Sequence, residues 1–209
     1  MTSTHRKPHV VGIGGTLRDG STGLRALEEA LRAAEEAGAT TELLDLRELA
    51  LPMYEPGKPL EEYGENVEKL VEAMRGADAM LWSTAAYHGT LAGVTKNALD
   101  FAQLLARDEK PYLQDKVVGL IATAGGNMAA VNAINAMVNV IHALRGVAAP
   151  LPVPVAQSWK VFDKEGNVWD EGIADRLETL GELVVEMATK LGPNVGAGET
   201  NGRTLQTVA

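Results

Sequence analysis

The first loop in this sequence that could bind a ligand spans residues 14–22. It offers three hydroxyls and one guanidinium, from Thr16, Ser21, Thr22 and Arg18. The loop leads from an apolar run into a helical pattern, and the N–H groups at a helix N-terminus favour an anion. A guanidinium can bind a phosphate through two hydrogen bonds. The loop therefore predicts a phosphate site. The alternative is a glycine-rich turn with a serine cap and a solvated arginine.

A second loop, residues 84–93, is uncharged and has two planar side chains, Tyr87 and His88, at its centre. Most of its other members are small, and small residues let the backbone approach a flat ligand closely. Tyr87 and His88 can stack on such a ligand or bond to its edge. The alternative is a structural turn with its aromatic side chain packed inward.

A third loop follows another apolar run and contains Thr123, Gly125 and Gly126. It presents bare backbone amides and a second helix start. None of the three loops is specific by itself. If they lie at one edge of a sheet, together they indicate a ligand site.

Two common nucleotide signatures are absent from the first loop. Gly12 and Gly14 begin a dinucleotide-binding fingerprint, but Leu17 stands where the third glycine should be. The best acidic candidate, Asp45, lies farther along than the roughly 20 residues expected. No Gly-Lys-Ser/Thr follows, so the sequence does not predict a P-loop either.

Apolar runs and amphipathic stretches alternate along the chain. We expect strands over 9–14, 39–46, 77–84, 116–123 and 146–155, and helices over 21–37, 61–75, 93–106, 128–144 and 173–191. A hairpin is expected near 163–167, where turn-forming residues gather. Five strands separated by helices predict a parallel sheet covered on both faces. The carboxyl ends of its strands would bring the three loops together.

Length and composition narrow the class of protein. The chain has 209 residues, 19 Lys+Arg, 28 Asp+Glu and a formal net charge of −9. We expect one domain over residues 1–191 and a flexible tail over 192–209. The acidity argues against nucleic-acid binding, which needs clustered Lys and Arg. Cysteine is absent and the first residues lack an apolar signal segment, so we expect a soluble, cytoplasmic protein.

Three motifs resemble the flavodoxin-like NAD(P)H-dependent FMN reductases. That family shows a Gly-Ser-x-Arg-x-x-Ser loop, a Tyr-Asn-Gly-Ser…Lys-Asn-Ala-Ile-Asp block and a Gly-Gly loop. The matching segments here are 15–21, then 87–90 with 96–100, then 125–126. The likeness spans roughly residues 8–190. It implies a three-layer α/β/α sandwich with a five-stranded parallel sheet in the order 2-1-3-4-5.

The resemblance also implies roles for individual residues. Thr16, Arg18 and Ser21 would hold the FMN phosphate, with Thr22 beside them. Along the isoalloxazine it places Ala86, Tyr87, His88, Gly89 and Thr90, and on the other side Thr123, Gly125 and Gly126. Four places depart from the family pattern, namely Ala85-Ala86, His88, Ala92 and Ala129-Ala130. Because His88 replaces an amide donor, we hypothesise that it donates to the N5/O4 edge of the flavin. The alternative is a loop histidine facing solvent.

The stretch from Val117 to Leu144 contains no Asp, Glu, Lys or Arg. A Gly-Gly-Asn break and a neutral polar stripe (Asn132, Asn135, Asn139 and His142) argue against a membrane span. A helix that is apolar nearly all round must be buried on more than one side. We therefore expect a homo-oligomer joined by this helix and the one carrying Lys96 and Asp100, and the resemblance implies dimers or tetramers. The alternative is that long loops of the same chain cover the outer side of this helix.

The leading interpretation is an FMN-dependent enzyme that takes hydride from NADPH or NADH. Reduced flavin would then supply a monooxygenase or reduce a quinone, an azo compound or a metal oxyanion. The first alternative is a flavodoxin-type electron carrier, and the second is a flavodoxin-like protein that binds nothing. The sequence does not distinguish NADPH from NADH. The 2′-phosphate of NADPH needs a cationic partner, and Lys58, Arg107 or Lys110 would serve if they reach the site.

Overall fold

The computed structural model describes residues 6–163 and 165–192, so the tail predicted over 192–209 lies outside the described residues except for Gly192. The strands are β1 (His9–Gly14), β2 (Thr40–Asp45), β3 (Ala79–Tyr87), β4 (Thr90–Leu91), β5 (Val117–Ala124), β6 (Val147–Ala148) and β7 (Val153–Ala156). The α-helices are α1 (Thr22–Glu36), α2 (Leu46–Leu49), α3 (Glu65–Gly76), α4 (Gly93–Asp100), α5 (Asn127–Ala143) and α6 (Glu171–Leu191). Three short 3₁₀ segments are η1 (Leu60–Glu62), η2 (Phe101–Leu105) and η3 (Ser158–Lys160).

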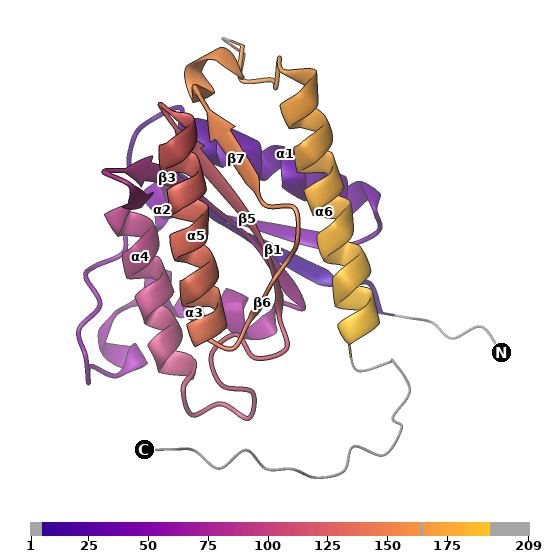
Figure 1. Ribbon diagram of the computed structural model, residues 1–209. Helices are drawn as coiled ribbons and strands as arrows, with labels where there is room; N and C mark the ends of the chain where they lie inside the picture. The colour runs from indigo at the N-terminus through magenta and orange to yellow at the C-terminus, as the bar shows by residue number, and fades with distance from the viewer. Residues whose placement is uncertain (1–5, 164, 193–209) are drawn as a thin grey trace, which may run out of the picture.

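The main strands form a parallel sheet in the order β2-β1-β3-β5-β6, which confirms the predicted class and order. Residues of α1 and α6 pack on one face of the sheet and residues of α3, α4 and α5 on the other, giving three layers (Figure 1). Side chains that alternate along each strand explain why both faces are apolar. Leu81, for example, packs on the face covered by α1 and α6, whereas its neighbour Trp82 packs on the face covered by α3, α4 and α5.

The number of strands was predicted wrongly, because seven rather than five pair in the residues described. The expected strand over 146–155 is two strands, β6 and β7, which both pair with β5. Between them Leu151 has a left-handed backbone (φ 62°), which is incompatible with a continuous ladder. The second addition, β4, pairs antiparallel with the end of β3.

Local signals in the sequence placed several element ends correctly. Ser21 caps α1, accepting a hydrogen bond from the backbone N–H of Leu24, and Gly38 (φ 99°) follows the end of that helix. The expected hairpin is present as an antiparallel bridge between Phe162 and Val168. The helix expected from residue 61 begins later, at Glu65, because Gly64 (φ 91°) separates it from η1.

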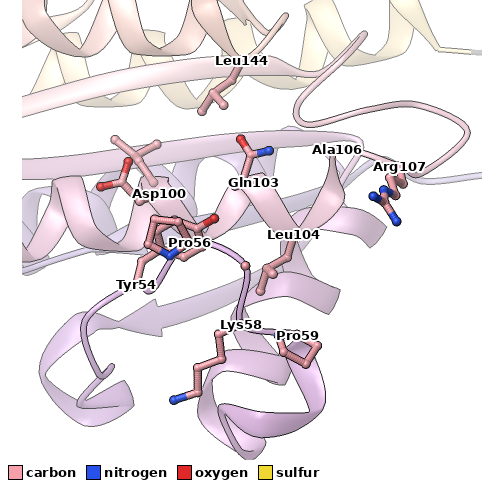
Figure 2. Close-up of a pocket in the computed structure, with 12 residues that line it drawn as sticks. Tyr54, Pro56, Lys58, Pro59, Asp100, Gln103, Leu104, Ala106, Arg107 and Leu144 are labelled. Carbon is pink, nitrogen blue, oxygen red and sulfur yellow. The ribbon is translucent and has the colours of Figure 1, made fainter.

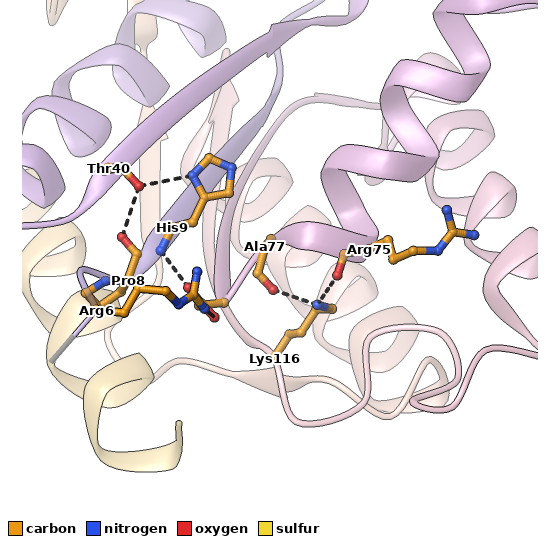
Figure 3. Close-up of polar contacts among 8 residues, drawn as sticks. Arg6, Pro8, His9, Thr40, Arg75, Ala77 and Lys116 are labelled. Atoms are coloured by element: carbon orange, nitrogen blue, oxygen red, sulfur yellow. Dashed lines mark hydrogen bonds and ion pairs between the residues drawn. The ribbon is translucent and has the colours of Figure 1, made fainter. Parts of the chain in front are cut away.

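The amino-terminal edge of the sheet is held by backbone-directed hydrogen bonds (Figure 3). Lys116 Nζ donates to the carbonyl oxygens of Arg75 (2.9 Å) and Ala77 (2.6 Å) at the end of α3. Asp78 accepts from the backbone N–H of His9 at 2.7 Å and from Arg6 at 2.5 Å. These contacts serve packing, and they lie at the edge opposite the three glycine-rich loops.

Candidate functional site

The carboxyl ends of β1, β3, β5 and β7 surround a pocket of about 250 Å³. All three loops singled out in the sequence contribute to its lining, as a parallel sheet requires. A fourth segment, after β7, completes the lining with Ser158 and Trp159. This segment was not predicted from the sequence. Its signal was a tryptophan placed just past the carboxyl end of a predicted strand.

The first loop is fixed to the sheet before it reaches α1. Gly15 adopts φ 90°, and its N–H donates to the buried Ser83 Oγ at 3.1 Å. Thr16 Oγ1 accepts from the N–H of Arg18 at 3.2 Å. The predicted residues Thr16, Arg18, Ser21 and Thr22 all line the pocket, together with Gly20. This loop therefore holds its hydroxyls and guanidinium around one space.

The donors of this loop suit an anion. Ser21 Oγ accepts from Leu24 N at 3.4 Å, which leaves the hydroxyl proton of Ser21 available for a second partner. The first N–H groups of α1 have no intrahelical acceptor, and the helix dipole adds partial positive charge there. The nearby carboxylate of Asp19 is paired with Arg47 Nη1 at 2.7 Å, which offsets the one negative charge in the loop.

The second loop is a tight hairpin between β3 and β4. Ala86 and Tyr87 pair with Leu91 and Thr90, leaving only His88 and Gly89 between the strands. Both of these have positive φ, 51° and 86°, as a two-residue type I′ turn demands. Ala85, Ala86 and Tyr87 line the pocket, whereas His88, Gly89 and Thr90 form the exposed hairpin end beyond them.

Buried hydroxyls join this hairpin to α4. Thr84 Oγ1 lies 3.0 Å from Thr95 Oγ1 and accepts from Ala92 N, also at 3.0 Å. In the next turn Asn97 accepts from Tyr54 N at 2.9 Å and donates to the Pro52 carbonyl at 2.8 Å. The block over 96–100 therefore has a structural role here, since Asn97 binds the segment after β2. Lys96 and Asp100 pair on the helix surface at 2.5 Å, as their spacing predicts.

The third loop supplies the opposite side of the pocket. Thr123, Ala124 and Gly125 line it, while Gly126 is the residue before α5 and does not. Gly125 lies close to the fourth segment, because a Cβ at Gly125 would be 3.6 Å from the Trp159 ring. All of the pocket residues were predicted from the sequence or are adjacent to predicted residues in the same loop, except Ser158 and Trp159, which come from outside all three loops.

A larger depression, of about 710 Å³, lies away from the loops between the segment after β2 and the α4–η2 region (Figure 2). Lys58 and Arg107 line it, and Lys110 lines depressions beside Arg75. None of these three cations lines the pocket of the glycine-rich loops. The smaller pocket is the candidate ligand site, because it gathers polar donors at the carboxyl ends of the strands.

Two negative findings concern the part of the chain that the structure describes. Within it, no cluster of three or more His, Asp or Glu side chains is arranged to hold a metal ion. None of the helices described is both long and apolar enough to cross a bilayer.

The family of this chain follows from a comparison of its sequence with family models. The model of NADPH-dependent FMN reductases matches residues 8–160, which contain β1 to η3 and therefore all four segments of the pocket. The chain belongs to this family, as the three motifs predicted.

Individual relatives are more distant. A curated FMN-dependent NADPH-azoreductase of Staphylococcus aureus (strain USA300) is 28% identical over 105 residues, which is 50% of this chain and 52% of that protein. The match thus spans about half the length of the curated relative. Among solved structures, FerB of Paracoccus denitrificans, a flavoenzyme NAD(P)H:(acceptor) oxidoreductase, superposes with a TM-score of 0.70 at 25% identity, covering 88% of this chain and 98% of FerB.

A second solved structure shares the fold at lower identity. The flavodoxin, WrbA-like protein of Agrobacterium tumefaciens superposes with a TM-score of 0.61 at 20% identity. The match covers 88% of this chain and 99% of the chain of that protein. This likeness supports the flavodoxin-like fold that the motifs implied.

Proposed function

We propose that this protein is an NAD(P)H-dependent FMN oxidoreductase whose flavin lies in the pocket of the glycine-rich loops. The observation that carries the proposal is the set of donors at the N-terminus of α1, where Arg18 and three hydroxyls line one space. Such a set matches the dianionic phosphate of FMN. Membership of the FMN reductase family supports the same ligand.

The proposed contacts follow the three loops. Thr16, Arg18, Ser21 and Thr22 bind the phosphate. Ala86, Tyr87, His88, Gly89 and Thr90 lie along the isoalloxazine, and Thr123, Gly125 and Gly126 close the other side of the pocket. Tyr87 lines the pocket with about half of its surface exposed, so its ring is free to cover a flat ligand.

When bound, FMN supplies the redox chemistry, accepting hydride from the nicotinamide and passing electrons to an acceptor. The protein then needs only to bind the phosphate, orient the ring and shape the space beside it. No acid–base pair of side chains is required. The relatives named for azoreductase and NAD(P)H:(acceptor) activity suggest a small-molecule acceptor such as a quinone, azo compound or metal oxyanion. Delivery of reduced flavin to a monooxygenase is the other proposed outcome.

The test is a visible absorption spectrum of purified protein mixed with FMN and freed of excess, then given NADPH or NADH without oxygen. We expect the flavin absorbance to bleach, and the faster nucleotide identifies the donor. Bound flavin that neither nucleotide reduces would favour an electron carrier. If no flavin is retained, turnover with excess free FMN distinguishes a releasing reductase from a protein that does not use flavin.

Arg18→Ala tests the phosphate contact directly. Charge-assisted hydrogen bonds contribute roughly 1.5–3 kcal/mol each, so the Kd for FMN should rise about ten- to a hundredfold. Arg32→Ala is the matched control, since Arg32 lies on α1 but pairs with Glu29 and Glu36 on the helix surface. Equal FMN affinity in the Arg18 variant and the control would refute the phosphate role.

We also propose that the protein forms a homodimer or homotetramer through α5 and α4. The outer side of α5 carries no charged residue and exposes Met128, Val131, Asn135, Asn139 and His142. An uncharged face of this kind suits burial against a second copy. Light scattering over a range of concentrations should give a mass above 22.1 kDa, and Val131→Glu should lower it. A monomer mass at every concentration would contradict the proposal.

Two further expectations remain proposals. We propose that residues 1–191 are one domain, because both core clusters are built on the same sheet. We also propose a cytoplasmic location, with which the cysteine-free composition is consistent. Limited proteolysis and cell fractionation test these two statements.

A further inference from the structure

The fourth side of the pocket is formed by an exposed tryptophan on a fixed segment. Trp159 lies in η3, directly after β7, and 63% of its surface is exposed. Its ring is 3.6 Å from the position that a Cβ on Gly125 would take, and it lines the same pocket as Arg18 and Ser21. A single exposed apolar side chain is ordinary on a protein surface, but this ring lines the pocket that also contains Arg18 and three hydroxyls.

The backbone on both sides of Trp159 is anchored. Before it, Ala156 at the end of β7 pairs with Ala124 of β5. After it, Val161 and Phe162 are buried in the core between α1, α6 and the sheet. The N–H of Lys160 donates to the Gln157 carbonyl at 2.8 Å, which closes the turn that carries the indole. Trp159 is therefore exposed but not placed on a loose loop.

A hairpin directly after this turn joins it to α1. Asp163 accepts hydrogen bonds from the backbone N–H groups of Gly166 (2.6 Å) and Asn167 (2.8 Å), which close the hairpin. Arg25 Nη1 donates to the Asp163 carbonyl at 3.4 Å. The Arg25 guanidinium also lies against Gly166, where an added Cβ would approach it to 2.7 Å. Arg25 thus links the hairpin to the helix whose N-terminus forms the phosphate cradle.

We propose that Trp159 closes the phosphate end of the flavin pocket, shields the contact between Arg18 and the phosphate from water, and thereby makes the site retain FMN in preference to riboflavin. This inference rests on the proposed FMN site. Excluding water strengthens the attraction between a guanidinium and a phosphate, because the local dielectric constant falls. Apolar groups around a polar contact commonly act in this way at interfaces.

The first experiment compares two ligands that differ only in the phosphate. In Trp159→Ala the Kd for FMN should rise about tenfold, the size typical of removing a large aromatic anchor, while the Kd for riboflavin should change less than about twofold. Trp159→Phe should restore most of the FMN affinity. Trp169→Ala is the matched control, since Trp169 is an exposed tryptophan (78%) of the same region that does not line the pocket.

A double-mutant cycle tests the shielding itself. If Trp159 acts on the contact between Arg18 and the phosphate, Trp159→Ala should weaken FMN binding much less in an Arg18→Ala background. Added salt should weaken FMN binding more in Trp159→Ala than in the wild type, because the exposed charges are screened. Gly166→Ala, which disturbs the hairpin without touching the pocket, should weaken FMN binding in the same direction and add nothing to Trp159→Ala.

Each outcome bears on the proposal. Additive effects of the Arg18 and Trp159 substitutions, an FMN affinity unchanged in Trp159→Ala, or an equal loss for FMN and riboflavin would overturn the inference and leave the proposed function intact. A wild-type protein that neither binds FMN nor turns over with free FMN would overturn both. Thermal unfolding of the ligand-free variants separates loss of the fold from loss of binding.

Discussion

Ser83 Oγ, buried in β3, accepts a hydrogen bond from the backbone N–H of Gly15 at 3.1 Å. This contact joins the central strand to the first loop at the residue where the chain turns with φ 90°. Space is limited at the same point, because a Cβ on Gly14 would lie 2.1 Å from Ser83 Oγ. The position of the first loop, the proposed phosphate site, is thus set by a side chain outside it.

Ser83→Ala should loosen this loop. The N–H of Gly15 would be left buried without its partner, at a cost of about 1–3 kcal/mol in the free energy of unfolding. FMN affinity should fall several-fold, because the hydroxyls and Arg18 would be held less firmly. Hydrogen exchange at the Gly15 amide is the direct measurement, with chemical denaturation beside it. An amide equally protected in the variant and the wild type would show that the contact does not hold the loop.

A second prediction concerns His88 at the hairpin end. Its φ of 51° is tolerated better by asparagine, and Asn-Gly is the favoured pair for this type of turn. His88→Asn should therefore keep the fold and bind FMN, with a free energy of unfolding unchanged or higher by about 0.5 kcal/mol. If His88 contacts the flavin edge, turnover should change while FMN affinity does not.

His88→Gly provides the control for that experiment, since glycine also accepts positive φ but offers neither imidazole nor amide. Kinetics identical to wild type in both variants would remove the flavin-edge hypothesis and leave His88 as a turn residue.

The fold could be predicted from the sequence because alternating apolar runs and helical patterns, with Ser21 and Gly38 as end signals, are local features. What could not be predicted depends on contacts between distant segments. Asp45 is a local case by contrast, since it caps α2 by accepting from Arg47 N at 2.9 Å, a role unrelated to a dinucleotide. Ser83 and Asn97 bind loops 68 and 43 to 45 residues away in the chain, and Trp159 lies against Gly125, about 34 residues away, so no local pattern predicts these contacts.

A third prediction concerns the crossing of α1 and α6. A Cβ on Gly181 would lie 2.3 Å from the Ala30 carbonyl oxygen, a backbone atom that cannot move alone. Gly181→Ala should therefore separate the helices and cost about 1–3 kcal/mol in the free energy of unfolding. Because α1 follows the proposed phosphate loop directly, FMN affinity should fall as well.

Gly172→Ala is the matched change on the same helix. Its Cβ would meet nothing closer than 3.5 Å, so it should instead stabilise the protein by up to about 1 kcal/mol through helix propensity. Urea unfolding of both variants is the measurement. A Gly181 variant as stable as the Gly172 variant would mean that the two helices are not in close contact.

The last prediction concerns the pH dependence of stability and Lys116. Burial of its ammonium lowers the pKa of Lys116 below its ordinary value of 10.5. Between the lowered pKa and 10.5 the unfolded chain binds more protons than the folded one, so the contribution of Lys116 to the free energy of unfolding rises with pH across that window. Below the lowered pKa the contribution is constant, because the lysine is charged in both states.

Lys116→Met isolates this contribution. At neutral pH the variant should be less stable by about 1–3 kcal/mol, since the carbonyl oxygens of Arg75 and Ala77 lose their donor. The difference between wild type and variant should then grow as the pH rises towards 10.5. Lys69→Met, at an exposed lysine of α3 that is not among the charges acting on Lys116, is the control. A difference for Lys116→Met that stays flat or shrinks across the window would contradict the lowered pKa.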